Sequence, residues 1–361
     1  MKTKSFFTAL MAAATLFVSC SKDSETPAGS DGAMMNVRLS YGDASTYAVD
    51  DPLTAGQNTT LASVLMYQMV GDNVLRVQEL TSEQISQMIG TSGLKIENVN
   101  TTVNGILIVG NAPGADKTAL TALTTRAAIE AYGLTVASQQ TGTAGSGVVN
   151  VTLMGYGAAT TTTTGTSTSG ATQKTAAVTV RPLVARMQVS GRVASSTDAS
   201  NQIQSIAWKK VFFNRYYTDN AKGTMQEYGP ADTQWNNGYP AWATDTYTTA
   251  TETANSKCYA YQFFPATSAD MGLLPMIVMQ ADVTLKDNRV LENYYITIKT
   301  FLDTTNAPIT QMNVNRIYNV DLSKLTVDHT DFTPEPNPGQ VDLTINVSVE
   351  AWTVQNITPS I

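Results

Sequence analysis

The sequence predicts a mainly β protein with a few short helices in its first half, built as two β-sandwich-like domains in tandem. Alternating apolar and polar residues recur along the chain, and this period of two is typical of half-buried strands. Of the 361 residues, 14% are charged, whereas soluble domains average roughly 25%. Because one core rarely serves more than about 250–300 residues, we expect two domains with largely uncharged polar surfaces.

Residues 1–19 have the parts of a secretory signal peptide, with Lys2 and Lys4 before an apolar run that ends at Val18. The run is shorter than the roughly 20 residues that a membrane-spanning helix needs. Cys20 follows directly and resembles the lipidated cysteine of bacterial lipoproteins, whose thiol and new amino group carry acyl chains. We therefore expect lipidation at Cys20, and the alternative is ordinary secretion with a cysteine near the cut.

Processing at Cys20 removes Lys2 and Lys4 and changes the formal charge from -7 to -9, which is -7 minus 2. Such an acidic chain is a poor partner for nucleic-acid phosphates. With Cys20 lipidated, Cys258 has no second cysteine for a disulfide within the chain. We interpret Cys258 as a small buried apolar residue.

A first domain is expected over residues 34–176, after a flexible polar tether at 20–33. It opens with a strand, residues 42–60 then indicate a long loop, and residues 61–70 predict a second strand. The apolar positions of the first strand are Met35, Val37, Leu39 and Tyr41.

Two helices are expected in this first domain. Thr81 and the glutamine three residues later form a capping box for a helix over residues 82–89. Asp116 is the expected cap of a second helix that extends to Tyr132. Between them, residues 105–110 form a continuous apolar run, which predicts a strand buried on both faces.

Residues 158–172 consist almost wholly of Thr, Gly, Ser and Ala and cannot build a core, so they predict a mobile loop and a candidate region for O-glycosylation. The domain boundary is expected after residue 176, and residues 177–333 form a second domain that is nearly all strand. Further strands are predicted at 148–154, 176–193, 206–213, 259–264, 276–285, 294–300 and 317–325.

Residues 334–361 combine a proline-rich spacer with the clearest alternating pattern in the chain. Its apolar positions are Val341, Leu343, Ile345, Val347, Val349 and Ala351, followed by Trp352. One interpretation is a last strand of the second domain, and the other is a donor strand offered to another molecule. Burying six such side chains gains roughly 8 to 15 kcal/mol. Ordering the backbone costs about as much, so donation needs a preformed groove.

Several segments, taken in order, resemble the Bacteroidales fimbrillins, the type V pilins that include the major fimbrial subunit. The resemblance covers nearly the whole chain, from the lipoprotein signal to the last strand. The segments lie at residues 107–113, 151–156, 180–187, 315–320 and 349–352.

This resemblance implies two transthyretin-like domains and a lipoprotein precursor at the outer membrane. In the family, a protease, typically Arg-specific, removes the lipid with the first strand. The C-terminal strand of the next subunit then fills the groove. Partners would be further copies, other fimbrial subunits and the protease, in a fimbrium that supports adhesion. Such head-to-tail contacts build filaments.

The expected cut site departs from this scheme in one respect. No Lys or Arg lies between Arg38 and Arg76, so the predicted long loop has no tryptic site. Cutting after Arg38 would fall inside the first strand. The alternatives are a protease of other specificity acting within residues 42–58, a shorter strand, or a subunit that stays uncut as a lipid-retained anchor. A tip subunit would need no donor strand.

The sequence predicts no catalytic site, cofactor or metal site. His329 is the only histidine, and no motif for nucleophilic catalysis or metal binding accompanies it. We therefore expect a protein that is not an enzyme. Trp235, Tyr239 and Trp242 surround Asn-Asn-Gly and could stack on a sugar, which makes a surface glycan-binding lipoprotein a further hypothesis. The alternative is an aromatic loop folded onto the sandwich.

Overall fold

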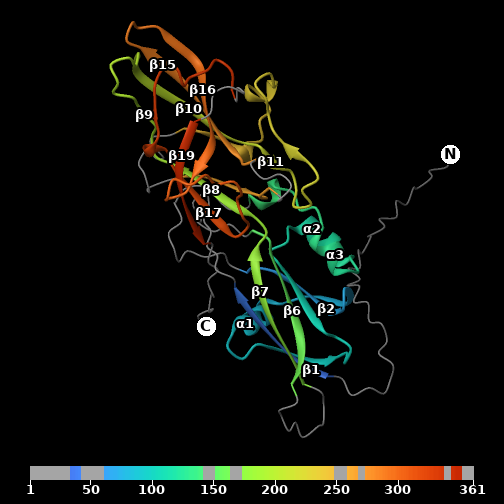
Figure 1. Cartoon of the computed structure of the whole chain (residues 1–361). Coiled ribbons are helices and arrows are strands. Elements are labelled where there is room, and N and C mark those ends of the chain that lie inside the picture. Colours follow the sequence, from blue (N-terminus) through green and yellow to red (C-terminus); the bar gives the residue numbers. More distant parts are fainter. Residues whose placement is uncertain are drawn as a thin grey trace, which may run out of the picture. The chain divides into compact units, whose positions relative to one another are not determined.

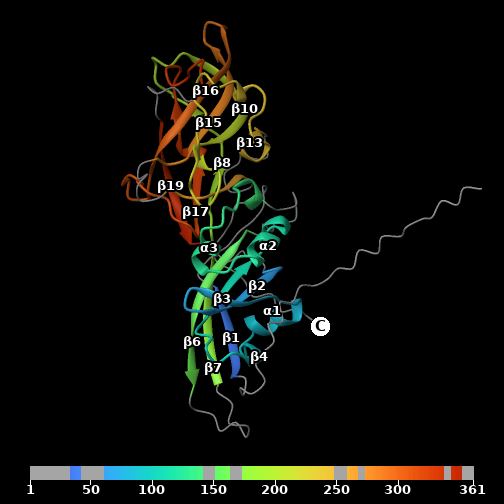
Figure 2. The same cartoon turned by 90° about the vertical axis from the view of Figure 1, so that its right-hand side faces the viewer.

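A computed structural model describes residues 33–41, 61–140, 151–162, 173–247, 258–266, 273–336 and 343–351. Over these ranges the protein is mainly β, with two large sheets and three α-helices (Figures 1 and 2). The predicted fold class is therefore confirmed. The signal peptide, Cys20 and the tether all lie outside the described residues. No helix in the described part is long and apolar enough to cross a membrane.

The first sheet has seven strands in the order β3-β2-β5-β6-β7-β1-β4. Their bounds are β1 Ala33–Tyr41, β2 Val64–Val70, β3 Asn73–Glu79, β4 Leu94–Val99, β5 Gly105–Gly110, β6 Leu153–Thr162 and β7 Gln173–Pro182. Most neighbours are antiparallel, whereas β1 and β7 run parallel. Because β1 lies between β7 and β4, this first described strand is inside the sheet and not at its edge.

The second sheet has eight strands in the order β13-β10-β15-β16-β19-β17-β8-β14. Their bounds are β8 Ala185–Ser190, β10 Ile203–Asn214, β13 Thr244–Thr246, β14 Tyr259–Phe263, β15 Met276–Leu285, β16 Val290–Leu302, β17 Arg316–Asp321 and β19 Leu343–Ala351. Two small ladders pair β9 (Ala194–Ser195) with β18 (Thr326–Val327), and β11 (Tyr216–Tyr217) with β12 (Met225–Gln226). Short 3-10 helices are η1 Ala137–Gln139, η2 Thr233–Trp235, η3 Ala241–Ala243 and η5 Leu322–Lys324.

Helix α1 (Ser82–Ile89) forms as predicted. Thr81 Oγ1 accepts a hydrogen bond from Gln84 N at 3.2 Å, and Gln84 Oε1 accepts one from Thr81 N at 3.0 Å. Ile85 and Met88 are buried on its inner face. The capping box thus fixes where this helix starts, and its apolar face decides what it covers.

The prediction of one helix from Asp116 to Tyr132 is wrong. The structure has α2 (Gly114–Thr121) and α3 (Arg126–Glu130) instead. The break has a tertiary cause, because Thr124 O accepts a hydrogen bond from Val74 N at 2.8 Å and Thr125 forms a β-bridge with Asn73. Thr125 then caps α3, and Asp116 accepts a hydrogen bond from Tyr132 Oη at 3.0 Å.

The prediction of a strand buried on both faces at residues 105–110 is confirmed by β5, in which every residue is buried. Ile106 and Ile108 join the main core, while Leu107 and Val109 pack in a second cluster with Leu120 and Ile129 of the helices. The pair α2 and α3 therefore covers the outer face of β2 and β5. This second layer explains the absence of polar alternation there.

The predicted loop at residues 158–172 is partly wrong, since strand β6 continues to Thr162. Thr160 lies opposite Thr175 of β7, and their hydroxyls are 3.2 Å apart. Threonine is β-branched and suits a strand when a partner is available. Residues 163–172 lie outside the described ranges.

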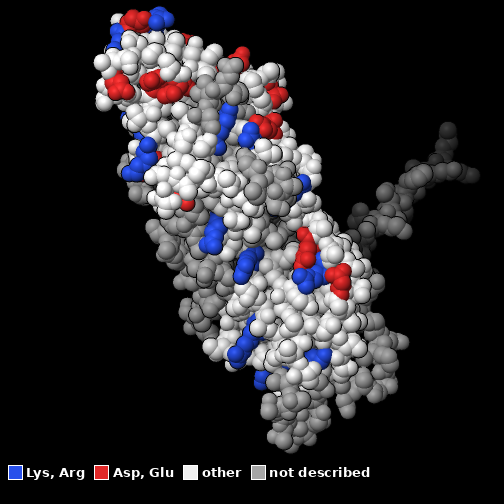
Figure 3. Space-filling model, in the orientation of Figure 1, with Lys and Arg blue, Asp and Glu red and all other residues white. Residues whose placement is uncertain are grey.

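The predicted domain boundary after residue 176 falls within β7, which belongs wholly to the first sheet. The chain passes to the second sheet between β7 and β8, where Leu183 N donates to Thr152 O at 3.1 Å and Asn315 N donates to Val184 O at 2.9 Å. The division into two domains remains a prediction. Figure 3 shows acidic and basic side chains gathered near the β15–β16 hairpin, and mainly separate Lys and Arg side chains on the middle and lower parts of this face.

Candidate functional site

The candidate site is the place of β1 in the first sheet, between β7 and β4. Strand β1 pairs with β7 in parallel, from Met34 opposite Gln173 to Tyr41 opposite Val180. On its other side it pairs with β4 in antiparallel, with Met35 opposite Ile96 and Val37 opposite Leu94. Removing β1 would therefore leave two facing strands with unpaired backbone groups.

The inward side chains of β1 are buried as the alternation predicts. Met35, Val37 and Leu39 are 1%, 0% and 6% exposed, whereas Arg38 and Ser40 are exposed. The three apolar side chains belong to the main core of the protein. At about 1.5–3 kcal/mol each, they hold β1 in the sheet more strongly than any surface contact would.

The groove that β1 occupies is apolar on its inner side. The core residues that line it share the cluster of Met35, Val37 and Leu39. They are Ala176, Val178 and Val180 of β7, Leu94 and Val99 of β4, and Ile85 and Met88 of α1. An empty groove would expose these side chains, so a replacement strand must bring the same alternation.

Arg38 lies just past the end of the β1–β4 ladder, at a position where the β1–β7 ladder continues. Its Cα partner on β7 is Ala177, but the antiparallel ladder with β4 has already ended at Val37 and Leu94. Arg38 is exposed, and its side chain lies against Gly93, which has φ +72°. The peptide bond after Arg38 is thus paired on one side only, and a protease would reach it after β1 has separated locally from β7.

The predicted donor strand forms β19 and lies inside the second sheet of its own chain (Figure 1). It runs parallel to β16, with Ile345 opposite Phe301, and antiparallel to β17, with Val347 opposite Val320. The structure thus shows the first of the two interpretations, a last strand of the second sheet. Donation to another molecule stays a prediction.

The inward side chains of β19 repeat the pattern of β1. Ile345 and Val347 are each 2% exposed and join the main core. Leu343 is half-buried, and the polar residues between them are exposed. The side chains of Tyr41, Val349 and Ala351 are not described, and Val341 and Trp352 lie outside the described residues.

Strands β1 and β19 are both interior strands of mixed sheets, with β1 second from the edge of its sheet and β19 closer to the middle of the other. Each is an interior strand with one parallel and one antiparallel neighbour, and each buries alternate apolar side chains. A strand that replaced β1 would have to pair in parallel on one side and in antiparallel on the other, as β19 does in its own sheet. The alternation of apolar and polar residues in the sequence indicated that β1 and β19 are alike. Which strands lie beside each of them is visible only in the structure.

The aromatic loop predicted as a sugar platform is folded onto the second sheet. Trp235 is 3% exposed and lies edge-on to Phe212, with ring centroids 5.2 Å apart. Tyr239 Oη donates to Phe213 O at 2.9 Å. Trp242 packs against Tyr216, with centroids 4.7 Å apart. The rings are used in packing, so the alternative of a loop folded onto the sandwich is the one observed.

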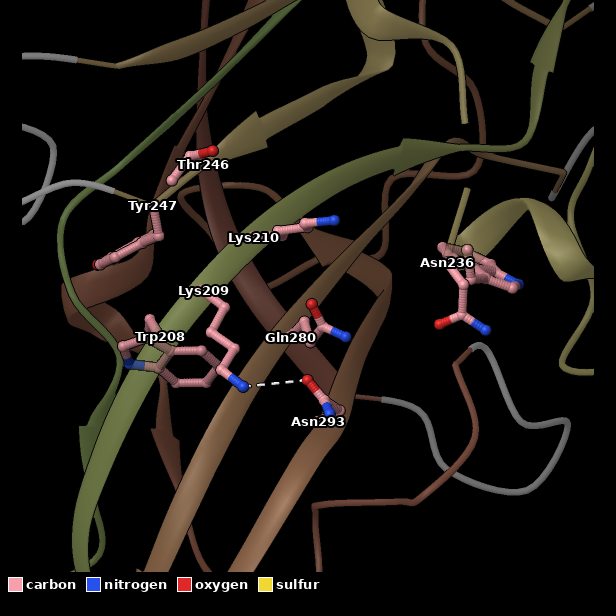
Figure 4. A pocket seen from close by; sticks show the side chains of 9 residues that line it. Trp208, Lys209, Lys210, Asn236, Thr246, Tyr247, Gln280 and Asn293 are labelled. Atoms are coloured by element: carbon pink, nitrogen blue, oxygen red, sulfur yellow. Dashed lines mark hydrogen bonds between the residues drawn. The ribbon is translucent and has the colours of Figure 1, made fainter. Parts of the chain in front are cut away.

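A cavity of about 480 Å³ lies beside this loop (Figure 4). Trp208, Lys209 and Lys210 of β10 line it together with Gln280 of β15 and Asn293 of β16. This cavity was not among the sites predicted from the sequence. The two consecutive lysines within a strand were a signal that could have drawn attention to it.

The described residues contain no cluster of His, Cys, Asp and Glu that could hold a metal ion. His329 Nδ1 accepts a hydrogen bond from Gln202 N at 3.4 Å, and Cys258 is buried.

Solved structures of similar fold come from Bacteroidales. A candidate cell adhesion protein from Bacteroides eggerthii has a TM-score of 0.59 and 14% sequence identity, and the match covers 90% of this chain and 98% of that one. A fimbrilin from Porphyromonas gingivalis has a TM-score of 0.57 and 15% identity, covering 90% and 99%. A candidate cell adhesion protein from Parabacteroides distasonis has a TM-score of 0.53 and 12% identity, covering 89% and 98%.

No protein-family model and no curated protein matches the sequence of this chain. The likeness to the solved structures extends over nine tenths of the chain and nearly the whole of each of the others. At this level of identity it demonstrates a shared architecture. The chain therefore has the fold of the Porphyromonas fimbrilin and of the two candidate cell adhesion proteins.

Proposed function

We propose that this chain is a non-catalytic structural subunit of a cell-surface fimbria, assembled head to tail by strand exchange and supporting adhesion. The observation that carries the proposal is the likeness of β1 and β19, each an interior strand that buries alternate apolar side chains between one parallel and one antiparallel neighbour. The fold shared with a fimbrilin supports it. The precursor would be an outer-membrane lipoprotein held by Cys20.

The first step is a cut after Arg38, which releases the part of β1 from Ala33 to Arg38. While β1 is tethered, its high effective concentration keeps the groove occupied, and an outside strand competes poorly. Cleavage separates Met35 and Val37 from the rest of the chain and allows the strand to dissociate. The groove between β7 and β4 then presents unpaired backbone and buried apolar side chains, which are costly in water.

The second step is entry of β19 from a neighbouring copy, with Leu343, Ile345 and Val347 as the described part of the donor. Val341, Val349, Ala351 and Trp352 complete the proposed donor. Because β19 is seated between β16 and β17, it must leave its own sheet first. Donation therefore requires that β16 and β17 tolerate or close the space that β19 leaves.

The resulting contact is heterologous, since the groove of one copy binds the strand of another. Such an interface does not close on itself and extends into a filament. Partners are therefore further copies of the chain, other fimbrial subunits and the maturation protease. The first proposed domain, 34–176, would carry the groove, and the segment 334–361 that follows the second domain, 177–333, would carry the donor.

N-terminal sequencing of subunits from sheared surface filaments tests the proposal. We expect the assembled chain to start directly after Arg38, or within residues 42–58, with Met35 and Val37 absent. Unassembled chain from the membrane fraction serves as the control and should retain Cys20. Filament subunits that keep the whole of β1 would refute the exchange mechanism.

A second candidate role is a lipid-retained anchor or a tip subunit of such a fimbria. The absence of Lys and Arg between Arg38 and Arg76 favours it, as does the pairing of Arg38 with β7. An anchor would keep its acyl chains and β1 in the assembled state. Mass spectrometry of the same filament preparation distinguishes an anchor, present in few copies with lipid, from a processed stalk subunit.

A further inference from the structure

The cavity beside the aromatic loop combines features of a small-molecule site that are separate from strand exchange. Its volume of about 480 Å³ lies within the roughly 300–1,000 Å³ typical of ligand pockets. It lies over the second sheet, on the side where Phe212, Val278 and Tyr295 form a cluster apart from the main core. Neither β1 nor β19 contributes to it.

A β-bulge creates the chemistry of this cavity. In a regular strand, consecutive side chains point to opposite faces. The register between β10 and β15 shifts between Trp208 and Lys210, so that Trp208 faces Ala281 and Lys210 faces Gln280. The extra residue, Lys209, therefore lines the same cavity as Lys210 (Figure 4). Bulges commonly redirect side chains at functional sites.

Lys209 and Lys210 differ in whether a neighbouring carboxylate neutralises their positive charge. Lys209 Nζ lies 2.6 Å from Asp282 Oδ1 and 3.0 Å from Asn293 Oδ1. Burial acts to raise the pKa of Asp282, but the hydrogen bonds from Lys209 and from Asn293 N, with the charge of Lys209, lower it overall. The carboxylate is thus ionised at neutral pH, and the charges of Lys209 and Asp282 cancel.

Lys210 has no carboxylate partner among the described residues. Its ammonium lies 5.9 Å from the ring centroid of Phe212, which is a weak interaction compared with an ion pair. The cavity therefore carries one uncompensated positive charge in a chain whose formal net charge is -7. One unbalanced cation matches a ligand with a single negative charge.

The remaining polar groups are amides rather than further charges. Gln280 Nε2 donates to Tyr295 Oη at 2.8 Å, which leaves its Oε1 to accept from a ligand. Asn236 is exposed on the loop and lines the cavity, as does Asn293. Side-chain amides offer both donors and acceptors and suit hydroxyl groups. The half-buried indole of Trp208 supplies the apolar part of the wall.

We propose that this cavity binds a carboxylate-bearing sugar. Lys210 pairs with the carboxylate, Asn236 and Gln280 hydrogen-bond the ring hydroxyls, and the indole of Trp208 contacts the apolar face of the ring. A phosphate dianion would leave one charge uncompensated. A neutral sugar would leave Lys210 without a partner. The site is independent of polymerisation and is present in the single chain.

Isothermal titration of the purified, unassembled chain with glucuronic acid, N-acetylneuraminic acid, glucose and inorganic phosphate tests this proposal. We expect both acidic sugars to bind at least tenfold more tightly than glucose and phosphate, and their affinity to fall with added salt because the pairing is electrostatic. Equal binding of glucose, tighter binding of phosphate, or no binding of the acidic sugars at millimolar concentration would overturn it.

Lys210→Gln should weaken binding of the acidic sugars at least tenfold. Lys95→Gln makes the same charge change at an exposed position on β4 and should leave binding unchanged. Asn236→Ala, on an exposed loop, should also weaken binding and decides the question if Lys210→Gln does not fold. Unchanged affinity in the folded Lys210 or Asn236 variant would show that the sugar binds elsewhere.

Discussion

Gln140 and Gln262 exchange two hydrogen bonds across the two halves of the chain. Gln140 Nε2 donates to Gln262 O at 2.5 Å, and Gln262 N donates to Gln140 Oε1 at 3.1 Å. Gln262 lies in β14, the last strand at one edge of the second sheet. One side-chain amide thus replaces a neighbouring strand at this residue and satisfies a backbone edge that would otherwise invite pairing with another chain.

Gln140→Ala should therefore lower the free energy of unfolding by about 1–3 kcal/mol, because a buried backbone donor and acceptor lose their partner. Urea unfolding followed by tryptophan fluorescence measures the change. Gln87→Ala, at an exposed helix position, should change stability by no more than about 0.5 kcal/mol. Equal effects of the two substitutions would show that the amide pairing at β14 contributes nothing specific.

Tyr67→Phe should leave stability unchanged or raise it at neutral pH. The Tyr67 hydroxyl is buried and has no hydrogen-bond partner in the described part of the chain, so its removal relieves an unsatisfied polar group. Tyr239→Phe is the matched control, because it removes a hydroxyl that donates to Phe213 O, and it should cost about 1 kcal/mol.

Tyr67→Phe should also change how the unfolding free energy depends on pH. Burial raises the pKa of Tyr67 in the folded chain, whereas the pKa of tyrosine in the unfolded chain is about 10. Above that pH the unfolded chain releases the proton that the folded chain retains, so the unfolding free energy falls as pH rises. Tyr67→Phe should make this decline shallower between pH 9.5 and 11, as followed by urea midpoints. An identical slope would argue against a buried neutral hydroxyl.

Arg186 is a buried cation in β8, the first strand in chain order of the second sheet. It is 0% exposed, its Nε donates to Gln188 Oε1 at 2.9 Å, and neither Nη1 nor Nη2 donates to an oxygen or nitrogen of the described residues. Burial lowers the pKa of Arg186 to about 10, against the opposing influence of Cys258. The folded chain thus bears the cost of a desolvated charge at neutral pH.

Arg186→Met keeps most of the side-chain volume and removes that charge, so we expect the free energy of unfolding to rise by about 1–3 kcal/mol. Arg181→Met makes the same change at an exposed position of β7 and should have little effect. Calorimetric melting temperatures compare the two. A marked loss of stability in Arg186→Met alone would mean that the guanidinium makes a favourable contact that outweighs its desolvation.

Arg38→Gln should block processing if an arginine-specific protease releases β1. The side chain is exposed and contributes little to holding the strand, so the variant should fold and be secreted normally. We expect it to accumulate at its precursor mass and to enter few filaments. Arg76→Gln, at an exposed position of β3, should be processed as before. Normal cleavage of Arg38→Gln would place the cut elsewhere, within residues 42–58.

Strand donation should also be visible in the second sheet. The backbone of β17 is paired with β19 on one side and with β8 on the other. If β19 is donated, then β17 amides that face β19 should exchange with solvent faster in filaments than in the single chain. The amides that face β8 should keep their protection and serve as the internal control. Undiminished protection on both sides would show that β19 stays in its own sheet.

The sequence predicted the secondary structure best where a local rule had no tertiary competitor. Thr81 with its capping glutamine defined α1, and the unbroken apolar run of 105–110 defined β5. The helix predicted from Asp116 failed because Thr124 and Thr125 pair with the start of β3. The threonine-rich stretch failed similarly, since its composition suggested a loop while β7 offered a partner strand.

The candidate site was only partly accessible to sequence. Alternation identified β1 and β19 and the side chains they bury, because period two is a local property of the chain. It could not reveal which strands lie beside them. The cavity at Lys210 depends on a bulge and on loop residues more than twenty positions away, so the two consecutive lysines in the strand were its only local signal.

The sequence by itself determined that this protein is mainly β and which side chains of its first and last strands, from Met35 to Leu39 and from Leu343 to Val347, face a core. The tertiary structure decided that both strands lie inside sheets, each between a parallel and an antiparallel neighbour. The physical reason is that side-chain alternation is encoded residue by residue. Pairing between strands is instead set by competition among segments far apart in the chain, which are compared only when the whole core is assembled.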